Sequence, residues 1–216
     1  MKSTGNFNHK SIALPDTLRY IPILCLFALI GATIPISSFA QTKNAEARMN
    51  ELGPENESLS QMVGNWEVTE TVWSSPTALP VTNKKYFAVR RMIGSILEEI
   101  MYDKDGSPLK DIERIDYLSF NRVEGRWKYL SMDARVPVGL MPGTSFTRGE
   151  TGKITIQFDP FSLPGTGPTV SGQMLRMDET ITMLNPDHSI KEQRFILADG
   201  DATPYLAHKY EYIRQK

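Results

Sequence analysis

Residues 173–198 read QMLRMDETITMLNPDHSIKEQRFILA, a stretch in which apolar and polar side chains alternate on both sides of a short turn. Alternation with a period of two is typical of a β-strand with one buried face. The segment Asn185-Pro-Asp-His188 between the two halves holds residues that favour tight turns. We therefore expect strands at about 173–184 and 189–198 that pair as a hairpin.

The same alternating pattern continues outward from this hairpin. Short polar turns separate the segments, and no long helical pattern intervenes. Further strands are expected at about 65–73, 82–93, 95–102, 112–121, 126–134, 145–149, 153–158 and 205–214. Two longer loops, at 136–143 and 160–168, would rim a barrel mouth. About ten short strands predict an all-β fold, an antiparallel up-and-down barrel, because closure removes the exposed edges of so long a sheet.

A polar lead-in precedes the strands. A short helix is expected at about 54–63, with Pro54 in its first turn and Gly64 after its end. The predicted organisation is a leader at residues 1–40, a polar helical lead-in at 41–62 and a β-barrel domain at 63–216.

The composition excludes two classes of protein. The chain has 216 residues, with 24 Lys and Arg against 25 Asp and Glu, and its formal charge is -1. This balance excludes a basic nucleic-acid-binding domain, so no nucleic acid is expected as a partner. Hydrophobic residues make up 40% of the chain, which excludes disorder over most of its length.

The first forty residues have the pattern of a secretory signal peptide. A basic start leads to an uncharged apolar run at 21–36, and small residues stand at Ser38 and Ala40. We expect cleavage after Ala40 and an exported protein, periplasmic or secreted. The long N-terminal region leaves an uncleaved membrane anchor as the alternative, and membrane contact is expected only through this segment. Cys25, the only cysteine, lies within the apolar run.

The ends of the predicted barrel resemble those of the calycin superfamily, to which the lipocalins belong. Gly64-Asn65-Trp66 opens the first strand and Arg214 closes the last. In calycins, a G-x-W at the start of the first strand meets an arginine from the end of the barrel, which lies over the tryptophan ring. The resemblance implies that Trp66 and Arg214 have a structural role at the closed end.

A closer resemblance is to the DUF1579 family, whose domains are uncharacterised, and it covers about 60–214. The motifs that carry it are Met62-Val-Gly64-x-Trp66, Arg91-Met-Ile-Gly94 with Glu98-Glu99, the strand Trp127–Asp133, and Tyr210-x-Tyr212-x-Arg214. The family often has more glycine around its second and third strands than this chain. The resemblance implies a calycin-like barrel and supplies no established activity.

Charged and aromatic side chains on otherwise apolar strand faces are the candidate ligand-binding residues. If those faces point inward, the barrel holds several ionisable groups that must be paired or hydrated. One interpretation is an internal salt-bridge network, such as Arg91 with Glu179; the other is a cavity whose polar groups orient a ligand. The candidates are Arg91, Trp127, Tyr129, Asp133, Glu179, His208 and Tyr210.

These residues favour an exported protein that binds a small, partly apolar molecule of unknown identity in the barrel interior. The alternatives are an enzyme that acts on a lipid-like or sugar-like molecule with cavity acids, and a non-catalytic envelope interaction protein. The sequence has no nucleophile-elbow motif and no HExxH motif, so we expect no catalytic residue, no metal site and no cofactor. Haem ligation by His208, as in nitrobindin-like barrels, carries less weight than a histidine that serves only the cavity.

Overall fold

The computed structural model describes residues 51–104, 111–164, 172–198 and 202–216 of the chain. The expected signal peptide with its cleavage site and Cys25, and residues 41–50 of the lead-in, lie outside the described residues. Their assignment stays a prediction. Within the described ranges, no helix has the length and apolar character needed to cross a membrane.

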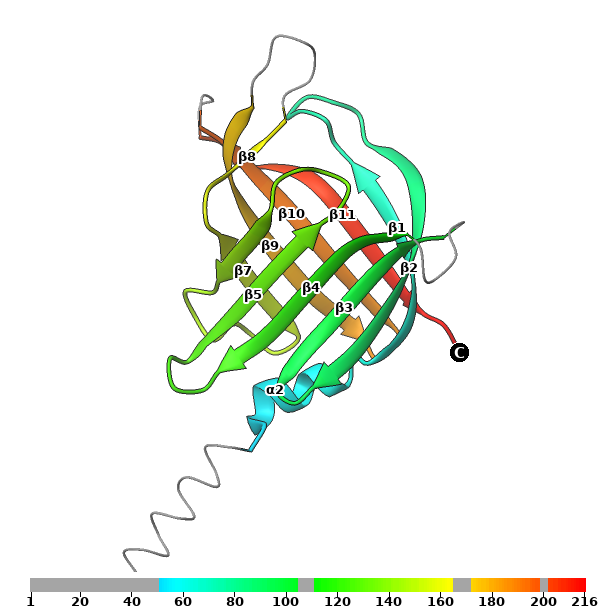
Figure 1. Cartoon of the computed structure of the whole chain (residues 1–216), viewed down its shortest axis with the longest axis vertical. Coiled ribbons are helices and arrows are strands. Elements are labelled where there is room, and N and C mark those ends of the chain that lie inside the picture. Colours follow the sequence, from blue (N-terminus) through cyan, green and yellow to red (C-terminus); the bar gives the residue numbers. More distant parts are fainter. Residues whose placement is uncertain (1–50, 105–110, 165–171, 199–201) are drawn as a thin grey trace, which may run out of the picture. The chain divides into compact units, whose positions relative to one another are not determined.

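Ten antiparallel strands form a closed barrel (Figure 1). Each strand pairs with its neighbour along the chain, and the β9–β10, β10–β11 and β11–β1 pairs complete the ring. β8 (Phe161–Leu163) continues β7 along the same edge of β9, after Asp159-Pro160. The ten strands are β1 (Gly64–Val72), β2 (Val81–Ile93), β3 (Ile96–Asp103), β4 (Ile112–Asn121), β5 (Arg126–Asp133), β6 (Leu140–Thr144), β7 (Lys153–Phe158), β9 (Gln173–Asn185), β10 (His188–Leu197) and β11 (Tyr205–Arg214).

One predicted strand was misplaced. The sequence favoured a strand at 145–149, whereas β6 lies at Leu140–Thr144 and begins within the expected loop 136–143. Pro142 and Gly143 indicated a loop because both disfavour central strands. In the barrel, the Pro142 carbonyl accepts a hydrogen bond from the Asp159 amide (3.1 Å). A Cβ at Gly143 would lie 2.6 Å from the Ile156 side chain, so glycine permits this close pairing of β6 with β7.

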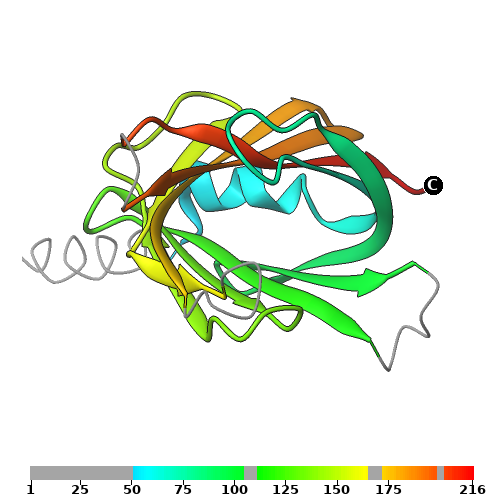
Figure 2. The same ribbon diagram turned by 90° about the horizontal axis from the view of Figure 1, so that it is seen from above.

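The single described helix, α2 (Gly53–Ser60), lies across one end of the barrel, where Figure 2 shows it behind the ring of strands. We call this end the floor and the opposite end the mouth. Leu59 and Met62 enter the apolar core from the helix side. The helix contacts β2, β3 and β4. It therefore covers the floor mainly on the side of those strands.

Trp66 and Arg214 meet at the floor. The Trp66 ring is fully buried, its Nε1 donates to the Met62 carbonyl (3.0 Å), and the Arg214 guanidinium carbon lies 4.3 Å from the ring centre. Arg214 also donates to the carbonyls of Gln61, Val63 and Pro186. One side chain thus joins the end of α2, the start of β1 and the β9–β10 turn.

A buried asparagine fastens α2 to β4. The Asn56 side chain donates to the Phe120 carbonyl (3.0 Å) and accepts from the Phe120 amide (2.7 Å), and only 3% of the residue is exposed. Asn56→Ala would leave both backbone groups unpaired, so we expect it to lower the free energy of unfolding by about 2–3 kcal/mol. Urea denaturation measures the change. Ser58→Ala, which removes an exposed hydrogen bond within the same helix, is the control, and equal losses in the two variants would contradict this role.

Candidate functional site

A layer of paired charges fills the barrel interior midway between floor and mouth. Glu99 lies at its centre and accepts from Arg90 (2.6 Å), Arg114 (3.4 Å), Lys191 (3.2 Å) and the Tyr212 hydroxyl (2.9 Å). All of these groups are buried. We call this set, with the residues of the next paragraph, the charged layer.

Lys191 extends the charged layer across the barrel. Its ammonium group donates to Asp116 (2.8 Å) and to the Tyr129 hydroxyl (2.9 Å), and it lies 4.0 Å from Glu179. Asp116 also accepts from Ser131 (2.6 Å) and lies 3.0 Å from Arg114 Nε. Side chains from β2, β3, β4, β5, β9, β10 and β11 therefore meet in one network.

The carboxyl groups of the layer have opposite pKa shifts. Burial alone would raise the pKa of Glu99, but Lys191, Arg90 and Arg114 hold it well below its usual value. Burial would also raise the pKa of Asp116, but the charges of Arg114 and Lys191 more than offset this and lower it. Burial raises the pKa of Glu179, and Lys191 offsets this only in part. Glu179 accepts one hydrogen bond from Gln193 (2.8 Å), and its Oε1 is buried with no hydrogen-bond partner among the described residues.

The charged layer separates two pockets, as the order of side chains along the strands shows. On β9, Ile181 lines a pocket at the floor, Glu179 belongs to the layer, and Met177 lines a pocket at the mouth. On β5, Trp127 lines the floor pocket and Asp133 the mouth pocket, with Tyr129 of the layer between them. We call the two spaces the floor pocket and the mouth pocket.

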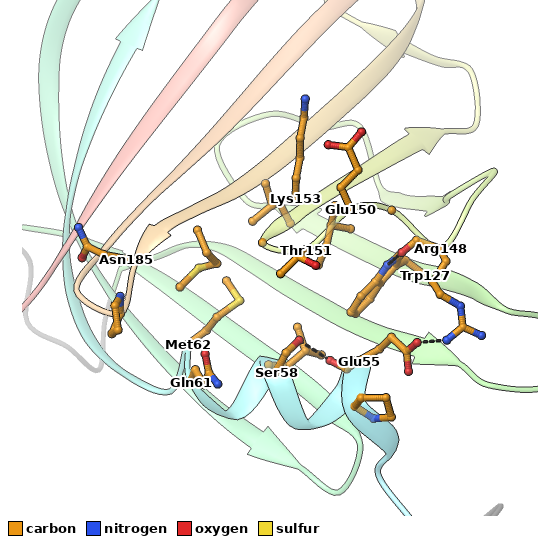
Figure 3. Close-up of a pocket in the computed structure, with 18 residues that line it drawn as sticks. Glu55, Ser58, Gln61, Met62, Trp127, Arg148, Glu150, Thr151, Lys153 and Asn185 are labelled. Atoms are coloured by element: carbon orange, nitrogen blue, oxygen red, sulfur yellow. Dashed lines mark hydrogen bonds and ion pairs between the residues drawn. The ribbon is translucent and has the colours of Figure 1, made fainter.

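The floor pocket has a volume of about 580 Å³ and lies between α2, the loop before β7 and the end of β9 (Figure 3). It occupies the side of the floor away from the strands that α2 contacts. In Figure 3, Met62 rises from the helix end toward Thr151, and the Lys153 chain points away from the helix. Its apolar lining consists of Pro54, Leu59, Met62, Trp127, Ile154, Ile181, Met183 and Pro186.

An ion pair bridges one side of the floor pocket. Arg148, from the loop before β7, pairs with Glu55 of α2 (Figure 3). The Arg148 carbonyl accepts from Trp127 Nε1 (2.8 Å), and the Arg148 guanidinium carbon lies 4.9 Å from the centre of the Phe120 ring. The pair therefore links α2 to the loop before β7 and, through the Arg148 carbonyl, to Trp127 of β5. The polar atoms of Gln61, Thr151 and Asn185 are also available around the pocket.

The mouth pocket is smaller, at about 170 Å³. Arg135, from the loop between β5 and β6, spans it: it donates to Asp133 (2.9 and 2.6 Å) and to the hydroxyls of Tyr86 (2.8 Å) and Tyr210 (3.2 Å). Pockets for drug-sized ligands have volumes of roughly 300–1,000 Å³. The space beside His208 therefore does not fit a haem.

The structure divides the candidate residues among four places. Trp127 lines the floor pocket, Tyr129 and Glu179 belong to the charged layer, and Asp133, His208 and Tyr210 line the mouth pocket. The inward position expected for Arg91 is wrong, because its side chain is 62% exposed and pairs with Glu98 on the outward face of the strands. The outward residues Phe87 and Val89 gave its face an apolar appearance.

The sequence reasoning missed the main members of the charged layer. Three of these members, Arg90, Glu99 and Lys191, point into the barrel. Arg90 lies on the same inward face of β2 as Tyr86 and Ala88. Alternation around Tyr86 and Ala88 would have placed Arg90 correctly. Lys191 alternates with Ser189 and Gln193, and this polar series has the pattern of a solvent-exposed face.

Comparison with known proteins gives structural likenesses at low sequence identity. No family model matches the chain, and neither does any curated protein. The solved structure of Rv2717c from M. tuberculosis aligns over 77% of this chain and 100% of its own, with 19% identity and a TM-score of 0.42. A redesigned β-barrel aligns over 73% of this chain and 94% of its own, with 13% identity and a TM-score of 0.30.

Proposed function

We propose that this chain is an exported, DUF1579-like binding protein that holds a small, partly apolar molecule in the floor pocket of its barrel. The observation that carries the proposal is the floor pocket itself, which is about 580 Å³ in volume and presents more apolar than polar surface. Its size lies within the range of pockets for drug-sized ligands. The leader-like residues 1–40 support export.

The lining suggests how such a ligand would lie. Its apolar part would rest against Trp127, Ile181 and Met183, where removal from water contributes about 25 cal/mol per Å² of apolar surface. Its polar part would stay near Gln61, Thr151 and Asn185, whose side chains offer hydrogen bonds. The charged layer behind the pocket is paired internally, with Arg114 beside Asp116 and Lys191 beside Glu179, so the ligand need not neutralise a buried charge.

The enzyme alternative receives less support from the geometry. It required Asp133, Glu179 and His208 to act in one site. Asp133 and His208 do line the mouth pocket, but Glu179 lies in the charged layer and lines neither pocket. A binding role needs no such constellation.

Blocking the floor pocket tests the proposal. Thr151 lies in an exposed turn that lines the pocket, so Thr151→Trp should fill the space with little cost to the fold. We expect 1-anilinonaphthalene-8-sulfonate, a fluorescent probe with apolar rings and one anionic sulfonate, to bind the native chain and to bind this variant at least about tenfold more weakly. Fluorescence titration gives both affinities, and native mass spectrometry of the purified chain detects a retained molecule.

Val123→Trp is the matched control, because Val123 lies in an exposed turn at the same end of the barrel and does not line the pocket. It adds the same side chain to the surface and should leave probe affinity unchanged. If the probe bound the native chain and Thr151→Trp with equal affinity, the floor pocket would not be the binding site.

A further inference from the structure

The mouth pocket is lined mainly by apolar side chains, and its volume suits a ligand with one aromatic ring. Its volume of about 170 Å³ is close to that of an engineered apolar cavity of roughly 150 Å³ that binds benzene. The rings of Phe195 and Tyr210 flank His208, at centre-to-centre distances of 5.6 and 6.0 Å. The other apolar walls are Val136, Val138, Met141, Phe161, Leu163 and Met177.

Most polar side chains of the mouth pocket are already engaged with protein partners. Asp133 is held by Arg135, and the Tyr210 hydroxyl accepts from the same guanidinium. Ser131 donates to Asp116, and Gln193 donates to Glu179. The charges at the mouth are therefore paired with one another, which favours a neutral ligand.

His208 is the exception. Among the described residues, the imidazole has one hydrogen-bond partner, Glu70, which lies 3.0 Å from Nδ1. Glu70 also accepts from Tyr86 (2.8 Å) and pairs with Arg135 (3.4 Å). Burial alone would raise the pKa of Glu70, but its hydrogen bond with His208 and the charge of Arg135 help to lower it to about 2.

In the neutral form of the His208 ring, the ionised Glu70 decides which ring nitrogen carries the proton. An ionised carboxylate only accepts hydrogen bonds, so Nδ1 of His208 carries the proton and donates to Glu70. Nε2 then carries a lone pair and is the acceptor left for a ligand. The ring stack with Tyr210, at an interplanar angle of 8°, holds the imidazole in this orientation.

We propose that the mouth pocket is a second ligand site, separate from the floor pocket, that takes a neutral single-ring aromatic alcohol of the phenol class. The ring of the ligand would pack among Phe161, Met177 and Phe195, and its hydroxyl would donate to Nε2 of His208. The apolar walls and the volume favour a single neutral ring, and the open acceptor on His208 favours a ring that carries a hydroxyl group.

Phenol and toluene form a matched pair of probes, because toluene replaces the hydroxyl with a methyl group of similar size. In the native chain labelled with ¹⁵N-histidine, phenol should change the Nε2 resonance of His208. Toluene should leave Nε2 without a new hydrogen bond. His188, whose ring pairs with Glu211 at the floor end of the barrel, is the internal control. No response of His208 to saturating phenol would overturn the proposal, and this readout needs no variant.

His208→Phe keeps an aromatic ring and removes the acceptor. Phenol affinity should fall by about tenfold in this variant, and toluene affinity by less than about twofold. Thr151→Trp, which fills the floor pocket, should leave phenol affinity unchanged. Loss of phenol binding in Thr151→Trp, or equal losses of phenol and toluene affinity in His208→Phe, would contradict the mouth pocket as the phenol site.

Discussion

Glu99→Gln should lower the free energy of unfolding by about 3–5 kcal/mol, the usual cost of removing one partner from a buried ion pair. Glu99 accepts from Arg90, Arg114, Lys191 and Tyr212, and 4% of the residue is exposed. The variant leaves three buried cations with only Asp116 and Glu179 as counter-charges. Glutamine has nearly the same shape, so the loss comes from charge and hydrogen bonding rather than from a cavity.

Glu179→Gln is the matched control for this change. Glu179 is as deeply buried as Glu99, but its pKa is raised by burial and its Oε1 has no hydrogen-bond partner among the described residues. A carboxyl group in that environment gains little from its charge, so the variant should cost less than about 1 kcal/mol. Urea denaturation at neutral pH measures both variants. Equal losses would show that the charged layer does not centre on Glu99.

The sequence predicted the barrel well because alternation is a local signal. Nearly every strand was placed within about one or two residues, and β6 was missed because Pro142 and Gly143 are accommodated only by the pairing with β7 and the neighbouring Ile156 side chain. Such accommodation depends on residues that lie later in the chain, and a local pattern does not contain it.

The interior of the barrel was less predictable for the same reason. Glu99 and Lys191 are 92 residues apart in the sequence and 3.2 Å apart in the barrel. Alternation identifies an inward face, but it does not say which strands lie opposite each other across the interior. Alternation correctly placed Glu179 inside the barrel. It failed at Arg91, because the half-buried outward residues Phe87 and Val89 have the same apolar pattern as an inward face. The residue next to Arg91, Arg90, does point inward and has the expected charged partner, Glu99.

Glu70 should make the protein lose stability in acid. Its pKa is about 2 in the folded chain, against 4.5 for an unperturbed glutamate, so the unfolded state binds a proton first as the pH falls. The stabilisation is complete above about pH 4.5 and is lost as the pH falls toward 2. A difference of this size corresponds to about 3 kcal/mol at neutral pH. Glu99 and Asp116 add loss in the same direction, since their pKa values are also lowered.

Glu70→Gln separates this contribution from that of the other carboxylates. The variant should be less stable than the native chain at pH 7, and the gap between the two should narrow steadily as the pH falls below 4.5. Urea denaturation at several pH values measures the gap. Glu67→Gln is the control, because Glu67 lies on the same strand and pairs with Lys85 and Lys104 in solvent, where screening makes such pairs weak. A gap between native and Glu70→Gln that stays constant from pH 7 to 3 would contradict the ionised Glu70 on which the Nδ1–H form of His208 depends.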